Sequence, residues 1–88
     1  MTTNAIEAVK EERRRQLEMW GDENHSLFEW AAILGEEYGE FCRAVNETYF
    51  EKGRYPELGG FKNISKEARH VAAVAVAIME FLEERYGA

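Results

Sequence analysis

Apolar residues in this chain recur every three or four positions, which is the spacing of one face of an α-helix. The chain contains a single proline, and most of its residues are good helix formers. We therefore expect an all-α protein, a small bundle of three main helices that is completed by oligomerisation. No internal repeat or low-complexity tract divides the chain, so we expect residues 1–88 to form a single domain.

The first helix is expected to begin near Asn4, where the sequence NAIE offers an N-cap and a glutamate at the third helical position. Further along, Arg13 to Arg15 form a basic run with two interpretations. They could be a solvated face whose stems pack on apolar surface, or a cluster that binds phosphate. The apolar stripe of this helix consists of Ile6, Val9, Leu17 and Trp20, and Arg13 lies along it.

The second helix is expected to begin after the break GDENHS, because Ser26 and Glu29 have the spacing of a capping box. It can run to about residue 50. Glu37 projects inside the apolar arc of this helix, Glu40 lies at the edge of the arc and Glu36 lies further round. The arc consists of Trp30, Leu34, Phe41 and Val45, with Ile33 and Ala44 at one edge.

Residues 52–65 contain the only proline and three of the seven glycines, so we expect a connecting loop there. Ser65 is then predicted to cap a third helix that ends near residue 86, with Gly87 as its stop. The sequence HVAAVAVAIMEFL is apolar on almost every side, which indicates burial among several helices. Glu67 projects from its innermost face and His70 lies at the flank; the apolar members of that face are Val71, Val74 and Ile78.

Each long helix thus carries an acidic residue where its pattern calls for an apolar one. A buried and unpaired carboxylate costs several kcal/mol or shifts its pKa until it is neutral. Compensation could come from Lys62, Lys66 or the first helix, or from a divalent cation held between the helices by oxygen ligands. Glu67 also has a simpler interpretation, as an acid in the first turn of a helix. Likewise, His70 could be a hydrogen-bonded histidine near a helix start.

Charge and size narrow the classes of function. The formal net charge is -6 and the pI is about 4.9, which argues against a nucleic-acid polymer as partner.

Cys42 is the only cysteine, so we expect neither an intrachain disulfide nor a cysteine-based zinc site. No signal peptide or membrane span is recognisable, and we expect a cytoplasmic protein that does not enter membranes. A domain this small buries only about two-thirds of its unfolded surface, which favours self-association.

The segments WGDENHSLFEWAAILGEEYGE and KEARHVAAVAVAIMEFLE resemble the MazG-like branch of the all-α nucleoside triphosphate pyrophosphohydrolases. Family members carry an EExxE motif on one helix and an ExxD motif on a later one. Glu36, Glu37 and Glu40 fit the first motif in full. The resemblance implies an enzyme that uses Mg²⁺ or Mn²⁺ to cut a nucleoside triphosphate between its α and β phosphates. The products are a nucleoside monophosphate and pyrophosphate, and the family works as homodimers or homotetramers.

Carried over residue by residue, the resemblance makes Glu37, Glu40 and Glu67 metal ligands and Glu36 an auxiliary catalytic carboxylate. The second motif departs from the family because it ends in His70 instead of Asp. As a ligand, an imidazole brings no negative charge and suits Mn²⁺, Co²⁺ or Zn²⁺ better than Mg²⁺. We therefore expect weaker magnesium binding and a preference for manganese. Two alternatives stay open: catalysis has been lost and binding remains, or protonated His70 replaces the cation by pairing with Glu67 or Glu37.

Four residues are candidates for substrate binding. Trp30 lies on the same helix face as Glu37 and could stack on a nucleobase, or it is simply part of the core. His25, in the turn before the second helix, is either at the substrate mouth or an ordinary surface histidine. Lys62 and Lys66 could contact the outgoing pyrophosphate, or they are ordinary solvated lysines.

The competing class is a non-enzymatic helical protein, such as a degenerate family member that binds a nucleotide or a partner as a dimer. It accounts for the apolar third helix as well as an enzyme does. It leaves the inward placement of Glu37 and Glu67 without an explanation, and we favour the enzyme for that reason. The pattern of residues does not distinguish between nucleotide substrates.

Overall fold

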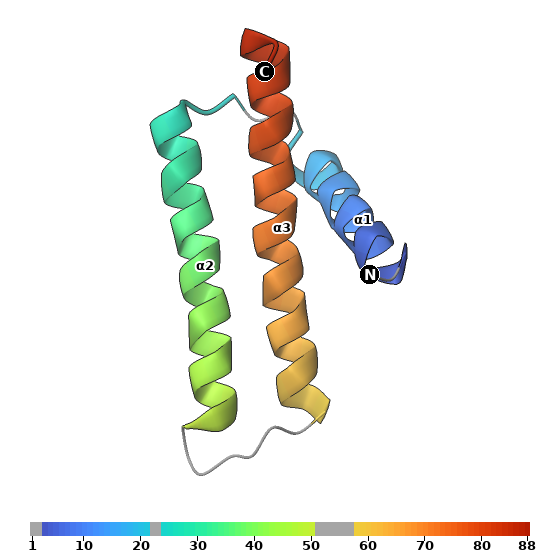
Figure 1. The fold of residues 1–88 in the computed structure, drawn as a ribbon, viewed down its shortest axis with the longest axis vertical. Helices are drawn as coiled ribbons and strands as arrows, with labels where there is room; N and C mark the ends of the chain where they lie inside the picture. The colour runs from blue at the N-terminus through green and yellow to red at the C-terminus, as the bar shows by residue number, and fades with distance from the viewer. Residues whose placement is uncertain (1–2, 22–23, 51–57) are drawn as a thin grey trace.

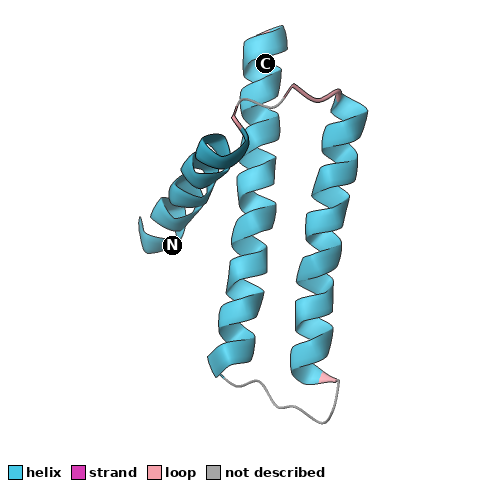
Figure 2. Cartoon of the chain, turned by 180° about the vertical axis from the view of Figure 1, so that it is seen from behind, coloured by secondary structure: helices cyan, strands magenta, loops and turns pink. Residues whose placement is uncertain are grey.

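The computed structural model describes residues 3–21, 24–50 and 58–88. Over these ranges the chain forms three α-helices and no strand (Figure 2). The expected all-α fold is therefore confirmed. None of the described helices is both long enough and apolar enough to cross a bilayer. The helices are α1 (Thr3–Trp20), α2 (Leu27–Tyr49) and α3 (Leu58–Tyr86).

The helix α3 is the central element of the fold. The helix α2 runs antiparallel beside it, and α1 lies obliquely against its other side (Figure 1). The contacts between helices join α2 to α3 and α1 to α3. This arrangement explains why α3 is apolar around most of its circumference, since two helices cover it from two sides. It also means that residues from all three helices meet at the middle of α3.

Local sequence sets several helix ends. The predicted capping box is present at the start of α2: Ser26 Oγ accepts a hydrogen bond from the Glu29 N–H at 3.1 Å, and the Glu29 carboxylate accepts one from the Ser26 N–H at 2.7 Å. Gly87 ends α3 as predicted, with φ 68° and its N–H donating to the Glu83 carbonyl at 2.9 Å. Gly21 ends α1 in the same left-handed conformation, with φ 72°, which glycine adopts without a Cβ clash.

The helix α1 begins at Thr3, close to the predicted start, but Asn4 lies in its first turn and does not cap it. The predicted start of α3 is wrong. The helix α3 begins at Leu58, so Ser65 is an interior residue of the helix and not its N-cap. Of the predicted loop, residues 52–57 lie outside the described residues, and the remainder is helical.

The glycine that suggested a loop has a packing role in α3. A Cβ placed on Gly60 would lie 2.7 Å from Thr48 Cγ2, well inside the van der Waals distance. Thr48 is buried on α2, and its hydroxyl donates to the Ala44 carbonyl at 2.8 Å, which holds the side chain in place. Gly60 therefore serves the close approach of two helices, a role that outweighs its poor helix propensity.

The core is narrow and is built mainly from small side chains. Trp30 is its one large member among the described residues, with 5% of its surface exposed. Ile33, Leu34, Ile78 and Phe81 pack around the Trp30 cluster while staying partly exposed. Large apolar side chains such as Phe28 (88% exposed) lie on the surface. The buried apolar residues are Trp30, Ala44, Ala73, Val74 and Ala77.

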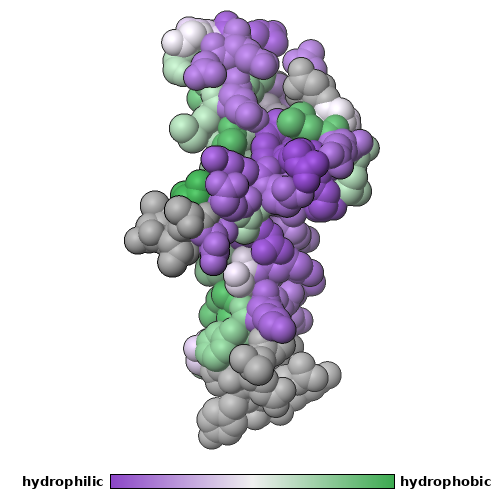
Figure 3. All heavy atoms as spheres, turned by 90° about the vertical axis from the view of Figure 1, so that its right-hand side faces the viewer, coloured by the Kyte–Doolittle hydropathy of each residue, from purple (hydrophilic) through white to green (hydrophobic). Residues whose placement is uncertain are grey.

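The basic run of α1 is engaged in ion pairs. Figure 3 views the molecule from the side of α1, where most of the surface is hydrophilic. Each arginine of the run has a carboxylate partner, and Arg14 and Arg15 lie on a charged helix face, whereas Arg13 is only 15% exposed and pairs across to α3. The pairs are Arg13–Glu80 (2.7 Å), Arg14–Glu18 (3.0 Å), Arg14–Glu11 and Arg15–Glu12 (2.6 Å).

Replacing Gly60 by alanine is expected to destabilise the protein by about 1–2 kcal/mol, because the added methyl group overpacks the contact with Thr48. In a Thr48→Ala background the same replacement is expected to stabilise the protein by up to about 1 kcal/mol, because alanine is the better helix former. Urea unfolding of the four proteins measures both effects. Stabilisation by Gly60→Ala in both backgrounds would contradict the close packing of α2 on α3.

Candidate metal centre

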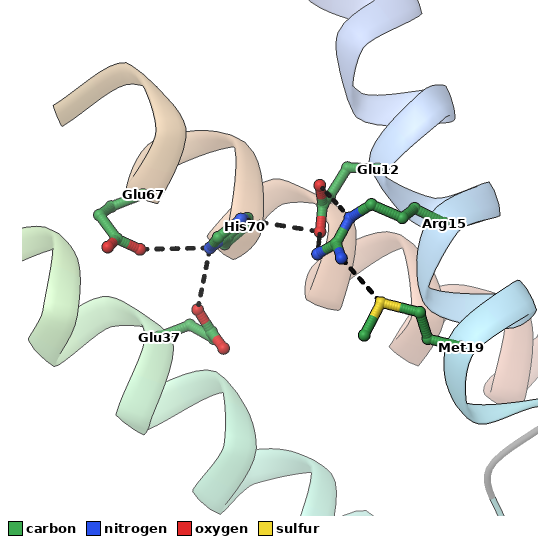
Figure 4. A network of polar contacts seen from close by, with 6 residues as sticks. All are labelled: Glu12, Arg15, Met19, Glu37, Glu67 and His70. Carbon is green, nitrogen blue, oxygen red and sulfur yellow. Dashed lines mark hydrogen bonds and ion pairs between the residues drawn. The ribbon is translucent and has the colours of Figure 1, made fainter. Parts of the chain in front are cut away.

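Glu37, Glu67 and His70 form one group of side chains between α2 and α3. The Nδ1 atom of His70 lies 3.2 Å from Glu67 Oε1 and 3.8 Å from Glu37 Oε2. The three potential ligand atoms all lie within 4.8 Å of one another. Figure 4 shows the two carboxylates converging on the same edge of the imidazole ring. The antiparallel packing of α2 against α3 brings these residues together, although they are about thirty positions apart in the sequence.

The other edge of the His70 ring faces α1. The Nε2 atom of His70 lies 3.7 Å from Glu12 Oε2, so the imidazole is bracketed by carboxylates from all three helices (Figure 4). Glu12 is only 6% exposed, which is unusual for a glutamate. Arg15 supports it with two hydrogen bonds, Nη2 to Oε2 at 2.6 Å and Nε to Oε1 at 3.2 Å. These bonds lower the pKa of the Glu12 carboxyl below its ordinary value and outweigh the effect of burial.

The pKa of Glu37 shifts in the opposite direction to the pKa of Glu12. Burial raises the pKa of the Glu37 carboxyl, and the negative charge of Glu40 raises it further. His70 lowers the pKa of Glu37, but not enough to reverse the shift, and the charges of Glu67 and Glu36 raise it further. The charged form of Glu37 therefore lacks a full partner among the described residues.

Two carboxylate oxygens in this group are buried without a hydrogen bond. They are Glu37 Oε2 and Glu67 Oε1, the two oxygens that face His70 Nδ1. Buried polar atoms in folded proteins nearly always have a partner, so such atoms call for an explanation. Within the described part of the chain, no hydrogen bond or ion pair joins Lys62 or Lys66 to them. The predicted compensation by these lysines is therefore absent there, whereas His70 contacts both oxygens.

The donor set and its spacing fit a divalent cation. Ligands held about 2.0–2.2 Å from one ion lie roughly 3–4 Å apart, and the His70 contacts of 3.2 and 3.8 Å fall in that range. Two carboxylates and a neutral imidazole are typical ligands of Mn²⁺, Co²⁺ or Zn²⁺, whereas Mg²⁺ prefers oxygen alone. Glu37, Glu67 and His70 are therefore able to hold such an ion.

A cavity of about 470 Å³ opens beside this group. One end contains Glu37, Glu40 and His70, and Glu12 also contributes to its wall. The other end is mainly apolar and aromatic, although Arg13 and Gln16 also line the cavity. The volume is that of an ordinary small-molecule site, which combines apolar walls with a few polar groups that orient the ligand. The residues at the apolar end are Trp20, His25, Trp30 and Ile33.

Trp30 connects the cavity to the core. Its ring meets His25 edge-on with centroids 4.9 Å apart, and it tilts against Phe81 at 6.5 Å. Its indole N–H has no hydrogen-bond partner among the described residues. Because so little of the ring is exposed, the structure favours the packing role for Trp30 over stacking on a nucleobase. Trp20, at 56% exposed, is the more accessible indole at this end.

A second cavity of about 410 Å³ shares Arg13 and Trp30 with the first. It lies towards the C-terminal end of α3, and charged side chains contribute much of its wall. None of the three grouped ligand residues lines it. We therefore place the candidate site at the first cavity.

The structure brings together some of the predicted site residues and separates others. Glu37, Glu67 and His70 converge, and Glu40, His25 and Trp30 line the cavity next to them. The predicted ligand Glu40 does not belong to the close group of three. The remaining predicted residues, Glu36, Lys62 and Lys66, are exposed and do not line this cavity.

Two simpler interpretations are wrong. Glu67 does not lie in the first turn of a helix, because α3 begins nine residues earlier at Leu58. For the same reason, His70 is not near a helix start. Both residues lie well inside α3, where the helix dipole offers little compensation for a buried charge.

Sequence reasoning missed Glu12 and Trp20 as members of the site. Glu12 follows Val9 by three positions, so it lies on the apolar side of α1, and this spacing could have revealed it. Glu12 stands in a run of six charged residues, and its sequence does not distinguish it from the neighbours that face solvent. Trp20 was assigned to the apolar stripe of α1, and nothing in the sequence places the end of α1 at this cavity.

Comparison with known proteins identifies no relative of this chain. No protein-family model, no curated protein and no solved structure matches the chain.

Without added metal, Glu37→Gln is expected to raise the stability of the protein at neutral pH. Glu37 has a raised pKa in the folded state, so its contribution to stability is fully present below the ordinary glutamate value of 4.5 and is lost as the pH rises through the folded pKa. The advantage of the variant should therefore grow from acid towards neutral pH. Thermal unfolding at several pH values measures it, with exposed Glu47→Gln on α2 as the control. A variant that is less stable than wild type at neutral pH would show that charged Glu37 is fully paired in the fold.

Proposed function

We propose that the protein is a metal-dependent nucleoside triphosphate pyrophosphohydrolase that releases a nucleoside monophosphate and pyrophosphate. The observation that supports this most is the convergence of Glu37, Glu67 and His70, since Glu37 and His70 line one end of a cavity whose other end is mainly aromatic. Such a site offers a cation for the phosphates and an apolar surface for a base. The EExxE motif and the partial second motif give the same proposal from the sequence, through their resemblance to the MazG-like enzymes.

In this proposal Glu37, Glu67 and His70 hold Mn²⁺ or Mg²⁺, with Glu40 available from the wall of the cavity. When bound, the cation would cancel phosphate charge and polarise the α-phosphorus centre. A cation is needed here because the cavity end is acidic and the substrate carries several negative charges. Partial burial of Glu37 and Glu67 strengthens their electrostatic effect by limiting the access of water.

A carboxylate next to the ligands would orient the attacking water by accepting its proton. Glu40 lines the cavity and Glu36 does not, so Glu40 has the position for this role in the described conformation. The family resemblance gives the role to Glu36, which neighbours Glu37 in the sequence and is exposed. The single variants Glu36→Gln and Glu40→Gln distinguish these assignments.

The nucleobase would occupy the end of the cavity formed by Trp20, His25 and Ile33. Stacking of a base on an aromatic side chain contributes about 1–3 kcal/mol and tolerates different bases. The exposed Lys62 and Lys66 remain candidates for contacting pyrophosphate. An enzyme of this kind would act on the cytoplasmic nucleotide pool.

The second candidate function is a helical dimer that binds a nucleotide or another protein without turnover. The observation in its favour is the number of large apolar side chains on the surface, including Phe28, Phe50 and Met79. The same surfaces serve the homodimer or homotetramer that we propose for the enzyme. Turnover therefore separates the two functions, whereas assembly does not.

Pyrophosphate release from a panel of ribo- and deoxynucleoside triphosphates, with Mg²⁺ and with Mn²⁺, tests the proposal. We expect turnover of at least one substrate, and its loss by at least 100-fold in Glu37→Gln, because the variant removes a charged ligand. Glu47→Gln, an exposed change on the same helix, should retain activity. Absence of release across the panel in both metals would contradict the enzyme and favour the binding protein.

His70→Asp is expected to increase magnesium-supported turnover relative to manganese-supported turnover. The variant replaces a nitrogen ligand by the carboxylate that the family motif carries, and Mg²⁺ prefers oxygen. The ratio of kcat/KM in the two metals is the quantity to measure, because it cancels a general loss of activity. An unchanged ratio would mean that His70 does not occupy a ligand position.

A further inference from the structure

The two nitrogens of His70 face different partners, and this difference carries information about the site. On one edge, Nδ1 faces the buried oxygens of Glu37 and Glu67. On the other edge, Nε2 faces Glu12 Oε2 at 3.7 Å (Figure 4). A neutral imidazole has one nitrogen that donates and one that accepts, so the ring must present a different chemistry on each edge.

Glu12 can only accept a hydrogen bond from this ring. Its two oxygens receive hydrogen bonds from Arg15 at 2.6 and 3.2 Å, and a paired carboxylate is an acceptor without a donor. A cation held by Nδ1, Glu37 and Glu67 would occupy the lone pair of Nδ1, so the neutral ring would then carry its proton on Nε2, towards Glu12.

The arrangement matches the pattern in which a metal-binding histidine donates its second N–H to a carboxylate. The partner carboxylate fixes the tautomer and the ring orientation, and it makes the ligand nitrogen more basic. The Nε2–Oε2 distance of 3.7 Å is longer than a hydrogen bond. A cation on Nδ1 would make the Nε2–H a stronger donor and so favour a shorter contact with Glu12.

We propose that Glu12, held by Arg15, is a positioning residue that directs Nδ1 of His70 towards the cation and gives the site its preference for Mn²⁺ over Mg²⁺. The inference rests on the proposed metal centre. Glu12 does not itself contact the cation in this account; it acts through His70. The preference follows because a more basic imidazole strengthens binding of Mn²⁺, whereas Mg²⁺ gains little from a nitrogen ligand.

Metal titration combined with NMR of the His70 ring tests the role of Glu12. Dissociation constants for Mn²⁺ and Mg²⁺ are measured for wild type, Glu12→Gln and Glu11→Gln. Glu11 is the exposed neighbour of Glu12 and pairs with Arg14, so it provides the matched control. We expect Glu12→Gln to weaken Mn²⁺ binding by about 10–100-fold and Mg²⁺ binding much less. Glu11→Gln should leave both constants unchanged.

The ring nitrogen shifts of wild-type His70, recorded at about pH 8 without metal and with diamagnetic Zn²⁺, test the tautomer without any variant. With Zn²⁺ bound, we expect the ion on Nδ1 and the proton on Nε2. Zn²⁺ on Nε2, or an equal loss of Mn²⁺ and Mg²⁺ affinity in Glu12→Gln, would overturn the role of Glu12 while leaving the metal centre standing. Wild type that binds neither Mn²⁺ nor Zn²⁺ would overturn the metal centre and this inference together.

Discussion

Excess negative charge where the three helices meet is the constraint on which the rest of the structure depends. Glu12, Glu37 and Glu67 each come from a different helix and surround the single imidazole of His70. Arg15 compensates Glu12, whereas Glu37 and Glu67, both half-buried, each keep one buried oxygen without a hydrogen bond and share His70 as their partner. Such groups cost several kcal/mol when they lack partners, a large share of the roughly 5–15 kcal/mol that stabilises a domain. A bound cation would remove that cost, so the same charges that weaken the fold can bind the metal.

The helical architecture concentrates this charge. The helix α3 lies between α1 and α2, and its buried Ala73 and Ala77 leave room for a close approach. Gly60 serves the same purpose against Thr48 further towards the start of α3. The two neighbours then supply carboxylates to opposite edges of one histidine ring. The cavity beside the ring joins this polar centre to an aromatic end, which gives one ligand access to both.

The sequence predicts much of the fold and part of the site. The capping box at Ser26 and the stop at Gly87 were correct because both depend on local hydrogen bonds and backbone conformation. The start of α3 was wrong because the glycines indicated a loop, whereas Gly60 is required by a tertiary contact. Glu37 and Glu67 stood out because each interrupts an apolar face. Glu12 did not, since it lies in a charged run and its burial depends on how α1 crosses α3, which no local pattern encodes.

The central claim is that Glu37, Glu67 and His70 bind one divalent cation. Anomalous diffraction from crystals grown with Mn²⁺ tests it most directly, because the signal locates the ion without reference to activity. Our account predicts a strong anomalous peak between these three side chains, with His70 Nδ1 as the nitrogen ligand. An empty centre in crystals that contain Mn²⁺, with His70 still paired to Glu67, would contradict it. The imidazole alone would then be what offsets the charge of the buried carboxylates.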